Sequence, residues 1–343
     1  MSEKAEYQAM KEREGILLNA NESSINLPFA IRKEIAEKIM EIDFHRYPED
    51  EASELCAAYA EYVGVGADQV IAGNGSDEML GLLIAMFIHK GEKLYTLTPD
   101  FSMYDYYVSM HEGEIVRFPR EPKAAFDVDA FIAKGKEENI KMVLFSNPNN
   151  PTGQIIAKKD LCRIVEAFDC PVVIDEAYGE FMGDTMVDQL DRYENLYVTR
   201  TLSKVFAFAA GRCGFLIANK KAMQQLRPHK VPYNVNSMTQ CAALVVLAHK
   251  EELLSQCELI KQEREQMIKE CLELNGDRLT LYPSYANFLY GRSPQKQQLL
   301  EMFEQQGITI RNYPDDTFRI TVGTPKENQE VLNILHAFEE GTK

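Results

Sequence analysis

Residues 141–153 have the sequence Lys-Met-Val-Leu-Phe-Ser-Asn-Pro-Asn-Asn-Pro-Thr-Gly, and this stretch decides the class of fold. The apolar run at 141–145 predicts a buried strand. Residues 146–153 contain two prolines and three asparagines, which indicates a rigid, polar turn directly after that strand. Ligands of open α/β sheets bind outside the carboxyl ends of the strands, so this turn is a candidate binding site. A turn of this composition could also serve the shape of the loop alone.

The sequence on either side of this stretch repeats the same alternation. From residue 69 to residue 219, short β-rich runs are separated by helical patterns. The other runs lie at 70–72, 93–96, 171–174, 196–199 and 214–218. Apolar strands separated by helices predict an α/β fold, with a parallel or mostly parallel sheet that helices cover on both faces.

The pattern changes after residue 235. A long helical region is expected at 237–275, followed by short strands at 286–290, 309–312 and 318–322 and a last helix at 325–340. This order indicates a smaller α+β domain. We therefore expect three parts: an N-terminal arm at 1–45 that contributes to the small domain, a large domain at 46–235, and a linking helix with the small C-terminal domain at 236–343.

The chain is acidic overall. It has 343 residues, of which 45% are hydrophobic, so it can bury a sizeable core. Its formal net charge is -16, which repels nucleic acid and anionic membranes and disfavours both as partners. An acidic protein that binds a phosphorylated ligand needs local positive charge, so basic residues near the strand ends are of particular interest.

The spacing of cysteines and histidines indicates neither a disulfide framework nor a metal site. The seven cysteines are scattered without a C-x-x-C pair, and the six histidines lack ligand spacing. Reduced thiols predict a cytoplasmic protein. Residues 1–15 lack the apolar run of a signal peptide, and no apolar stretch of the chain is long enough to span a bilayer.

A glycine turn precedes one of the predicted helices. Residues 73–78 have the sequence Gly-Asn-Gly-Ser-Asp-Glu, and they follow the predicted strand at 70–72. The free amides of a helix N-terminus bind phosphate, and Ser76 can add a hydroxyl. Taken by itself, the segment favours an ordinary capped helix over a phosphate site, because a lone glycine motif is a weak signal.

An acid and a lysine follow two further strands. Asp175 comes directly after the apolar run at 171–174, where it is either a solvated acid or the counter-ion of a cationic ring nitrogen. Lys204 follows the strand at 196–199 and stands beside Ser203, Val205 and Phe206. Most lysines are solvated surface residues, but apolar surroundings lower a lysine's pKa and free its amine for Schiff-base chemistry.

Together these segments resemble the class I/II aminotransferases of fold type I and, more narrowly, the histidinol-phosphate aminotransferases. The resemblance extends from about residue 17 to residue 325. It includes the stretches at 18–22, 46–48, 146–153, 175–178, 200–204 and 319–324. It implies an α/β large domain with a mostly parallel, seven-stranded type of sheet, and a smaller α+β domain built from the C-terminal segment and the N-terminal arm.

The resemblance also implies pyridoxal 5'-phosphate as cofactor and assigns its contacts. Lys204 would bind the cofactor as a Schiff base and Asp175 would pair with its ring nitrogen. Tyr178 and Asn150 would hydrogen-bond the 3-oxygen, and Tyr104 would stack on the ring. The resemblance thus implies that Lys204, Asp175 and Tyr178 are the catalytic residues.

The phosphate and the oligomeric state follow from the same resemblance. The residues expected around the cofactor phosphate are Gly75, Ser76, Asp77, Ser203 and Arg212. Tyr47 would reach the phosphate of a neighbouring subunit, so a homodimer with shared active sites is expected. The family often has Ala-Gly-Leu-Arg where residues 209–212 are Ala-Ala-Gly-Arg, but Arg212 keeps its offset from Lys204.

The expected reaction is transamination between a small-molecule amino donor and a 2-oxo acid. By resemblance, Arg319, Arg311 and Asn21 would bind the substrate, although both arginines end strands and could instead lie on the surface. The leading pair is histidinol phosphate and 2-oxoglutarate, a step of histidine biosynthesis. The alternatives are an aromatic or broad-range amino-acid aminotransferase and a decarboxylase of a phosphorylated amino acid. A nicotinamide dehydrogenase is disfavoured because no G-x-G-x-x-G follows a strand.

Overall fold

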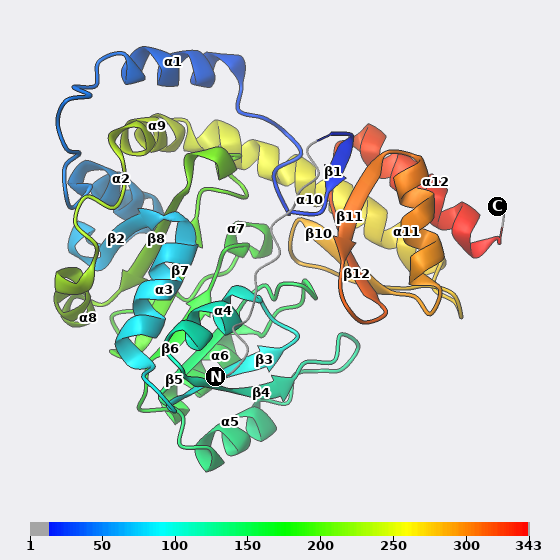
Figure 1. Cartoon of the computed structure of the whole chain (residues 1–343), viewed down its shortest axis with the longest axis horizontal. Coiled ribbons are helices and arrows are strands. Elements are labelled where there is room, and N and C mark those ends of the chain that lie inside the picture. Colours follow the sequence, from blue (N-terminus) through cyan, green and yellow to red (C-terminus); the bar gives the residue numbers. More distant parts are fainter. Residues whose placement is uncertain (1–13, 342–343) are drawn as a thin grey trace.

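A computed structural model describes residues 14–341 of the chain. Its strands form two sheets, one of seven strands and one of five, with helices around them (Figure 1). The α/β class expected from the sequence is confirmed. Residues 1–13 of the expected N-terminal arm and residues 342–343 of the expected C-terminal domain lie outside the described range.

The larger sheet is mostly parallel, as predicted. In spatial order its strands are β2 (Val70–Asn74), β8 (Cys213–Ala218), β7 (Leu196–Thr201), β6 (Val172–Asp175), β5 (Met142–Ser146), β3 (Lys93–Thr98) and β4 (Glu114–Pro119). Strand β8 pairs antiparallel with both of its neighbours, whereas the pairs from β7 to β4 are all parallel. The carboxyl ends of six strands therefore lie at one edge.

Helices cover both faces of this sheet. Along β8, Phe215 and Ile217 join one apolar core cluster, while Leu216 between them joins the other, as expected for side chains that alternate across a strand. The helices over the face of Leu216 are α3 (Gly75–Phe87), α4 (Met103–Met110) and α8 (Lys220–Leu226). Those over the opposite face are α2 (Ser53–Val63), α5 (Val128–Glu137), α6 (Lys158–Ala167) and α9 (Ser237–Ala248).

Strand β4 was not expected from the sequence. It pairs with β3 at the edge of the sheet, and each of its residues is either partly buried or exposed. An edge strand of this kind mixes charged and apolar residues, so it lacks the continuous apolar run that identifies the central strands.

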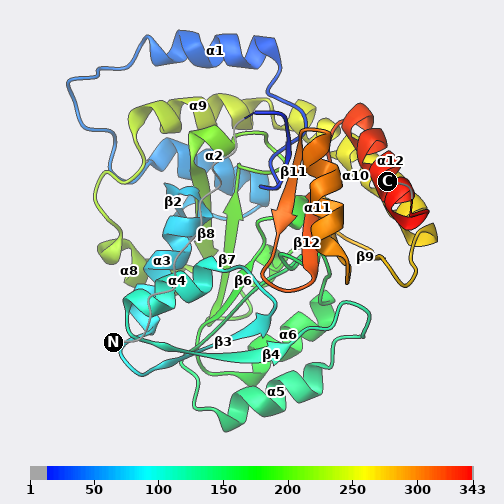
Figure 2. The same cartoon turned by 45° about the vertical axis from the view of Figure 1, so that its right-hand side comes forward.

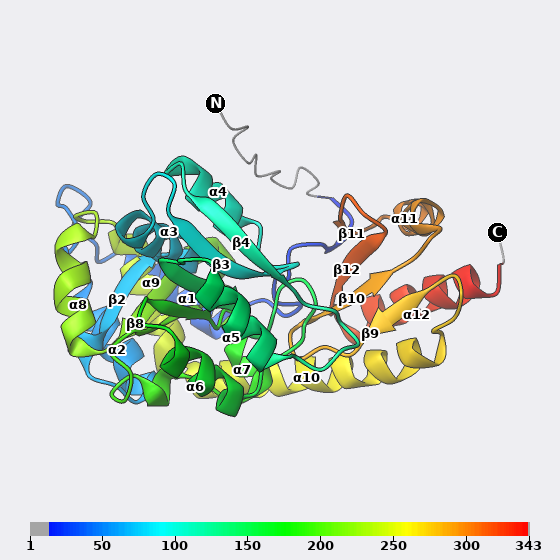
Figure 3. The same ribbon diagram turned by 90° about the horizontal axis from the view of Figure 1, so that it is seen from below.

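The smaller sheet combines one strand from the N-terminal part of the chain with four strands from its C-terminal part. In spatial order it contains β1 (Ile16–Leu18), β11 (Ile308–Asn312), β12 (Thr317–Thr321), β10 (Phe288–Arg292) and β9 (Thr280–Tyr282). Its helices are α10 (Lys250–Glu273), α11 (Lys296–Gln305) and α12 (Pro325–Glu339). Figure 3 shows α10 extending from the large sheet along the small one. Within residues 14–341, no helix combines the length and apolar composition needed to cross a membrane.

The expected N-terminal arm is divided between the two sheets. Strand β1 pairs with β11 of the small sheet, but α1 (Phe29–Ile39) packs on α9 at the outside of the large domain (Figure 2). The helix predicted at 237–275 is also divided, since His249 separates α9 from α10. The domain boundaries at 46 and 236 stay predictions.

A glycine lets α3 begin directly against the sheet. Gly214 of β8 lies so close to the first turn of α3 that an added Cβ would stand 2.1 Å from the amide nitrogen of Ser76 and 2.3 Å from the carbonyl carbon of Gly75. Both contacts are with backbone, which cannot move aside without displacing the helix. The missing side chain therefore fixes where the N-terminus of α3 lies.

We expect Gly214→Ala to displace the first turn of α3 and to lower the free energy of unfolding by about 1–3 kcal/mol, the usual cost of overpacking. Urea unfolding monitored by circular dichroism measures this. Gly276→Ala is the matched control, because its nearest contact is not backbone but the end of the Glu339 side chain, at 3.2 Å. Equal stability of the two variants would contradict the proposed contact.

Candidate active site

A cavity of about 450 Å³ lies between the carboxyl ends of the large sheet's strands and the small sheet. Most of the residues singled out in the sequence line it, although they come from segments far apart in the chain. These residues are Gly75, Ser76, Asp77, Asn150, Asp175, Tyr178, Ser203, Lys204, Arg212, Arg311 and Arg319.

Asp175 supplies a buried acid at the end of β6. Its Oδ1 accepts hydrogen bonds from the Thr199 hydroxyl at 3.0 Å and the Ala177 amide at 3.2 Å, and its Oδ2 accepts one from the Tyr104 hydroxyl at 3.0 Å. Burial raises the pKa of Asp175 to about 6, while the Tyr104 and Thr199 hydrogen bonds oppose that rise. The carboxyl group is therefore mostly ionised at neutral pH and can pair with a cation in the cavity.

Lys204 supplies an amine in the same cavity. Its Nζ donates to the carbonyl oxygen of Ala20 at 3.1 Å and lies 5.6 Å from the centre of the Tyr178 ring. Enclosure by protein, helped by the nearby positive charge of Arg319, lowers the pKa of Lys204 to about 8. About a tenth of the amine is then neutral at pH 7, far more than for an ordinary lysine, and a nucleophile or a general base requires this neutral form.

The N-terminus of α3 and Arg212 form a positively charged end of the cavity. Gly75 has a positive φ of 78°, and an added Cβ would stand 2.8 Å from Nη2 of Arg212. That guanidinium nitrogen also donates to Asp77 at 3.1 Å. Amides of a helix N-terminus, hydroxyls of Ser76 and Ser203 and a guanidinium are the donors that a phosphate dianion needs.

These groups fit pyridoxal phosphate. The helix end with Arg212 suits its phosphate, the buried carboxylate of Asp175 suits a protonated ring nitrogen, and the amine of Lys204 suits its aldehyde. The cradle at Gly75, which any side chain would fill, leaves room for a ligand close to the backbone.

Arg319 lies at the opposite side of the cavity on β12. Its Nη1 donates to Oδ1 of Asn150 and its Nη2 donates to the carbonyl oxygen of Asn19 at 2.9 Å. In the register of β11 and β12, Arg311 is its direct partner. Directly opposed residues project from the same face of a sheet, so both guanidinium groups reach the cavity. Tyr313, which the sequence did not single out, lines the cavity beside them.

Tyr104 is placed differently from the expectation that it stacks on a ligand ring. It is fully buried behind Asp175 and is not among the residues that line the cavity. Phe101 lines the cavity instead, and its ring meets that of Tyr104 edge to face, with centroids 5.7 Å apart. In this structure Phe101 faces the cavity, and Tyr104 donates a hydrogen bond to the acid from behind it.

Two other expected residues also lie outside the cavity of this chain. The buried Nδ2 of Asn21 donates to the Tyr178 hydroxyl at 2.9 Å, so Asn21 contacts the site through Tyr178 and does not line it. The side chain of Tyr47 is 82% exposed and stacks on Tyr233 at the surface. Its expected contact with a neighbouring subunit stays a prediction.

Sequence reasoning missed a second carboxyl group near Asp175. Asp100 lines the cavity, accepts hydrogen bonds from the Ser146 hydroxyl at 2.5 Å and its amide at 3.2 Å, and has a pKa raised well above its usual value by burial. Its position directly after the strand at 93–98 and next to Pro99 was the available signal. The predicted polar turn at 146–153 thus forms hydrogen bonds with Pro99 and Asp100, the two residues that follow β3.

The chain matches a family model described as aminotransferase class I and II over residues 13–335. It is 38% identical over 333 residues to the histidinol-phosphate aminotransferase of Clostridium novyi (strain NT), which covers 96% of this chain and 93% of that protein. The crystal structure of the histidinol-phosphate aminotransferase from Clostridium acetobutylicum has a TM-score of 0.85 at 24% identity, covering 95% and 99% of the two chains. That of Sinorhizobium meliloti, in complex with pyridoxal-5'-phosphate, has a TM-score of 0.84 at 20% identity, covering 94% and 91%.

Tyr104→Phe should raise the pKa of Asp175 above about 6, because it removes a hydrogen bond to the ionised form. Isotope-edited infrared titration of the carboxyl groups, with Asp175→Asn to assign the signal, measures this pKa. Tyr106→Phe on the same helix is the control and should leave it unchanged. An unchanged pKa in Tyr104→Phe would show that the hydrogen bond does not support ionisation.

The reactivity of Lys204 toward a neutral acylating reagent should rise about tenfold per pH unit and level off near pH 8, as its amine loses the proton. Mass spectrometry of the cofactor-free protein quantifies the labelling at this residue. Arg319→Gln should move the midpoint to higher pH, because the guanidinium favours the neutral amine. Arg292→Gln, on the same sheet but paired with Asp316, is the control, and a midpoint near 10.5 in the native chain would contradict the lowered pKa.

Proposed function

Because the chain belongs to the aminotransferase class I and II family, it is a pyridoxal-phosphate-dependent aminotransferase, and we propose that its preferred amino donor is histidinol phosphate. The acceptor is 2-oxoglutarate, and the products are imidazole acetol phosphate and glutamate. Support comes from curated histidinol-phosphate aminotransferases that match this chain over more than nine-tenths of its length.

The observation that supports this donor most directly is the pair of guanidinium groups opposite the cofactor end of the cavity. Arg311 and Arg319 face each other across β11 and β12, and both line the cavity. Two forked cations suit a phosphate dianion better than the single carboxylate of an ordinary amino acid. The oxo acid, with two carboxylates, can use the same pair in the second half of the reaction.

Pyridoxal phosphate, when bound, supplies an aldehyde that condenses with an amine and a protonated ring that withdraws electrons from the donor's Cα. Gly75, Ser76, Ser203 and Arg212 would hold its phosphate, beside Asp77, whose carboxylate accepts a hydrogen bond from Arg212. Asp175 would hold the proton on its ring nitrogen. Phe101 would pack against the ring, while Asn150 and Tyr178 would face its 3-oxygen.

The residues of this chain then perform the remaining tasks. The Lys204 amine, about half neutral when the pH equals its pKa of about 8, would accept the proton from the donor's Cα and would deliver it to the former aldehyde carbon of the cofactor. Asn21 holds the Tyr178 hydroxyl in place through its hydrogen bond of 2.9 Å. Arg319, itself oriented by Asn150 and Asn19, fixes the donor so that its Cα lies near Lys204.

We place the active site in a homodimer. Large apolar side chains are exposed on and after α1 and from residue 231 to the start of α9. They are Phe29, Met40, Phe44, Tyr47, Val231, Tyr233 and Met238. Exposed apolar surface of this extent favours a protein partner, and a second copy would bring Tyr47 to the phosphate end of the neighbouring cavity.

The seven free thiols agree with the expected cytoplasmic location.

The purified protein should transfer an amino group from histidinol phosphate to 2-oxoglutarate with a kcat/KM well above that for Phe, Tyr or Leu. Coupled assay of glutamate formation measures the four donors side by side. If kcat/KM is higher for Phe than for histidinol phosphate, the proposed donor is wrong, but the assignment as an aminotransferase remains. Release of carbon dioxide without an oxo acid would favour a decarboxylase instead.

Arg311→Gln should lower kcat/KM for histidinol phosphate about 10- to 100-fold, the loss expected for one charge-assisted contact to a phosphate, and change it much less for Phe. The affinity for pyridoxal phosphate should be unchanged, because Arg311 lies away from Arg212. Arg292→Gln on β10, paired with Asp316 outside the cavity, is the matched control. An equal loss of kcat/KM for both donors would show that Arg311 does not recognise the phosphate of the substrate.

A further inference from the structure

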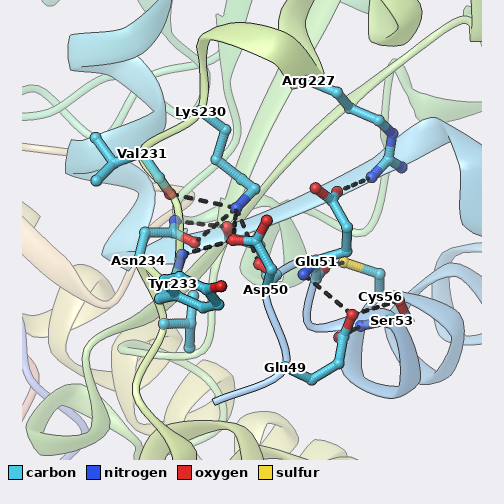
Figure 4. Close-up of polar contacts among 12 residues, drawn as sticks. Glu49, Asp50, Glu51, Ser53, Cys56, Arg227, Lys230, Val231, Tyr233 and Asn234 are labelled. Carbon is cyan, nitrogen blue, oxygen red and sulfur yellow. Dashed lines mark hydrogen bonds and ion pairs between the residues drawn. The ribbon is translucent and has the colours of Figure 1, made fainter. Parts of the chain in front are cut away.

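Lys230 is a buried lysine outside the cavity. Its side chain is 3% exposed and follows the short helix Arg227–His229. Its Nζ donates to the carbonyl oxygen of Asp50 at 2.9 Å, to Oδ1 of Asp50 at 3.2 Å, to the carbonyl oxygen of Val231 at 3.2 Å and to Oδ1 of Asn234 at 3.4 Å (Figure 4). A buried ammonium group needs such acceptors in place of water, so these contacts fix its surroundings closely.

Lys230 connects two segments that are about 180 residues apart in the chain. The carboxylate of Asp50 also accepts a hydrogen bond from the Tyr233 amide at 2.6 Å. Next to it, Nε2 of Gln240 donates to the carbonyl oxygen of Glu49 at 2.9 Å. The segment before α2 is therefore anchored to residues 230–240 at several points, with Lys230 as the buried centre (Figure 4).

Each of the two anchored segments has an exposed tyrosine. Tyr47 is 82% exposed and Tyr233 is 47% exposed. Their rings stack, with centroids 4.9 Å apart and planes 20° apart. A stacked pair in water is too weak to order two loops, so their position depends on the anchor beneath them.

The same anchor also reaches the phosphate end of this chain's own cavity. Nδ2 of Asn234 donates to the carbonyl oxygen of Ala72 at 3.0 Å and to Oε2 of Glu78 at 3.0 Å. The carbonyl oxygen of Asn234 accepts from Nδ2 of Asn74 at 2.6 Å. Lys230 is thus placed to act either on the neighbour's cavity through Tyr47 or on its own through Asn234.

We propose that Lys230 is a positioning residue that fixes Tyr47 for the active site of a second copy of this chain. The proposal rests on the homodimer of the proposed function. The greater number of contacts supports it, since two of the four acceptors of Lys230 belong to Asp50, three residues after Tyr47, and only one to Asn234. Loss of Lys230 would then weaken the neighbour's site and leave its own intact.

The first experiment measures pyridoxal phosphate affinity by titrating the cofactor-free dimers. Lys230→Met should weaken binding about tenfold, as expected for the loss of one well-oriented charge-assisted contact to the phosphate. Asp50→Asn should have a similar effect, and the double variant should be no worse than either single variant. Lys221→Met, which removes an exposed ion pair with Glu194, is the matched control and should bind as the native chain does.

The second experiment separates the two directions of action. A hybrid dimer is made from differently tagged chains, one with Lys204→Ala and the other with Lys230→Met. Its single remaining Lys204 lies in the subunit that lacks Lys230, while the neighbour has an intact Lys230 and Tyr47. We expect this site to bind pyridoxal phosphate with native affinity and the hybrid to have about half of the native activity.

Affinity in the hybrid as weak as in the Lys230→Met homodimer would overturn the proposal, because Lys230 would then act within its own subunit. Unchanged affinity in the Lys230→Met homodimer, with only a lower melting temperature, would overturn it as well. If Lys230→Met does not fold, the hybrid with Asp50→Asn gives the same test. Absence of histidinol phosphate activity in a dimeric native protein refutes the proposed donor alone, whereas a monomeric native protein refutes this inference.

Discussion

A carboxylate removed from water must be held by donors from the protein, and this constraint at Asp175 determines much of the surrounding structure. Its three donors come from different elements. Thr199 lies on β7, directly opposite Asp175 in the register of two parallel strands. Tyr104 lies on α4, behind the carboxyl group, and the amide of Ala177 belongs to the turn that follows β6. The acid is therefore available only once the parallel sheet and the helix over its face are in place.

The same enclosure acts in opposite senses on the two titrating groups of the site. It raises the pKa of Asp175 to about 6 and, with the charge of Arg319, lowers the pKa of Lys204 to about 8. Burial disfavours the charged form of each group, so one cavity brings an acid and an amine closer together in pKa than they would be in water. At neutral pH the carboxyl group is mostly an anion and part of the amine is neutral, which is what a cation-binding acid and a proton-accepting base each require.

The sequence predicted the residues whose position follows directly from the end of a strand. Asp175 is the last residue of β6, and Lys204 comes shortly after the end of β7 at Thr201. Their place at the edge of the sheet therefore needs little more than the strand assignment. Phe101 and Tyr104 are three residues apart, and which ring faces the cavity depends on where α4 begins, which a sequence pattern places only within a few residues. Asn21 lies in a segment without regular structure, so its contact with Tyr178 could not be derived from a period.

Because the chain is acidic overall, a phosphorylated ligand must be bound by donors inside the cavity that are already oriented. At a formal net charge of -16, the chain repels a phosphorylated ligand at long range. Salt screens that repulsion beyond roughly 8 Å, so binding depends on contacts made inside the cavity. Flexible surface lysines would give little there, because water competes for each contact. The chain instead uses a helix N-terminus fixed by Gly214 and a guanidinium on Arg319 that is already oriented by hydrogen bonds. Their geometry is set before the ligand arrives, so little freedom is lost when it binds.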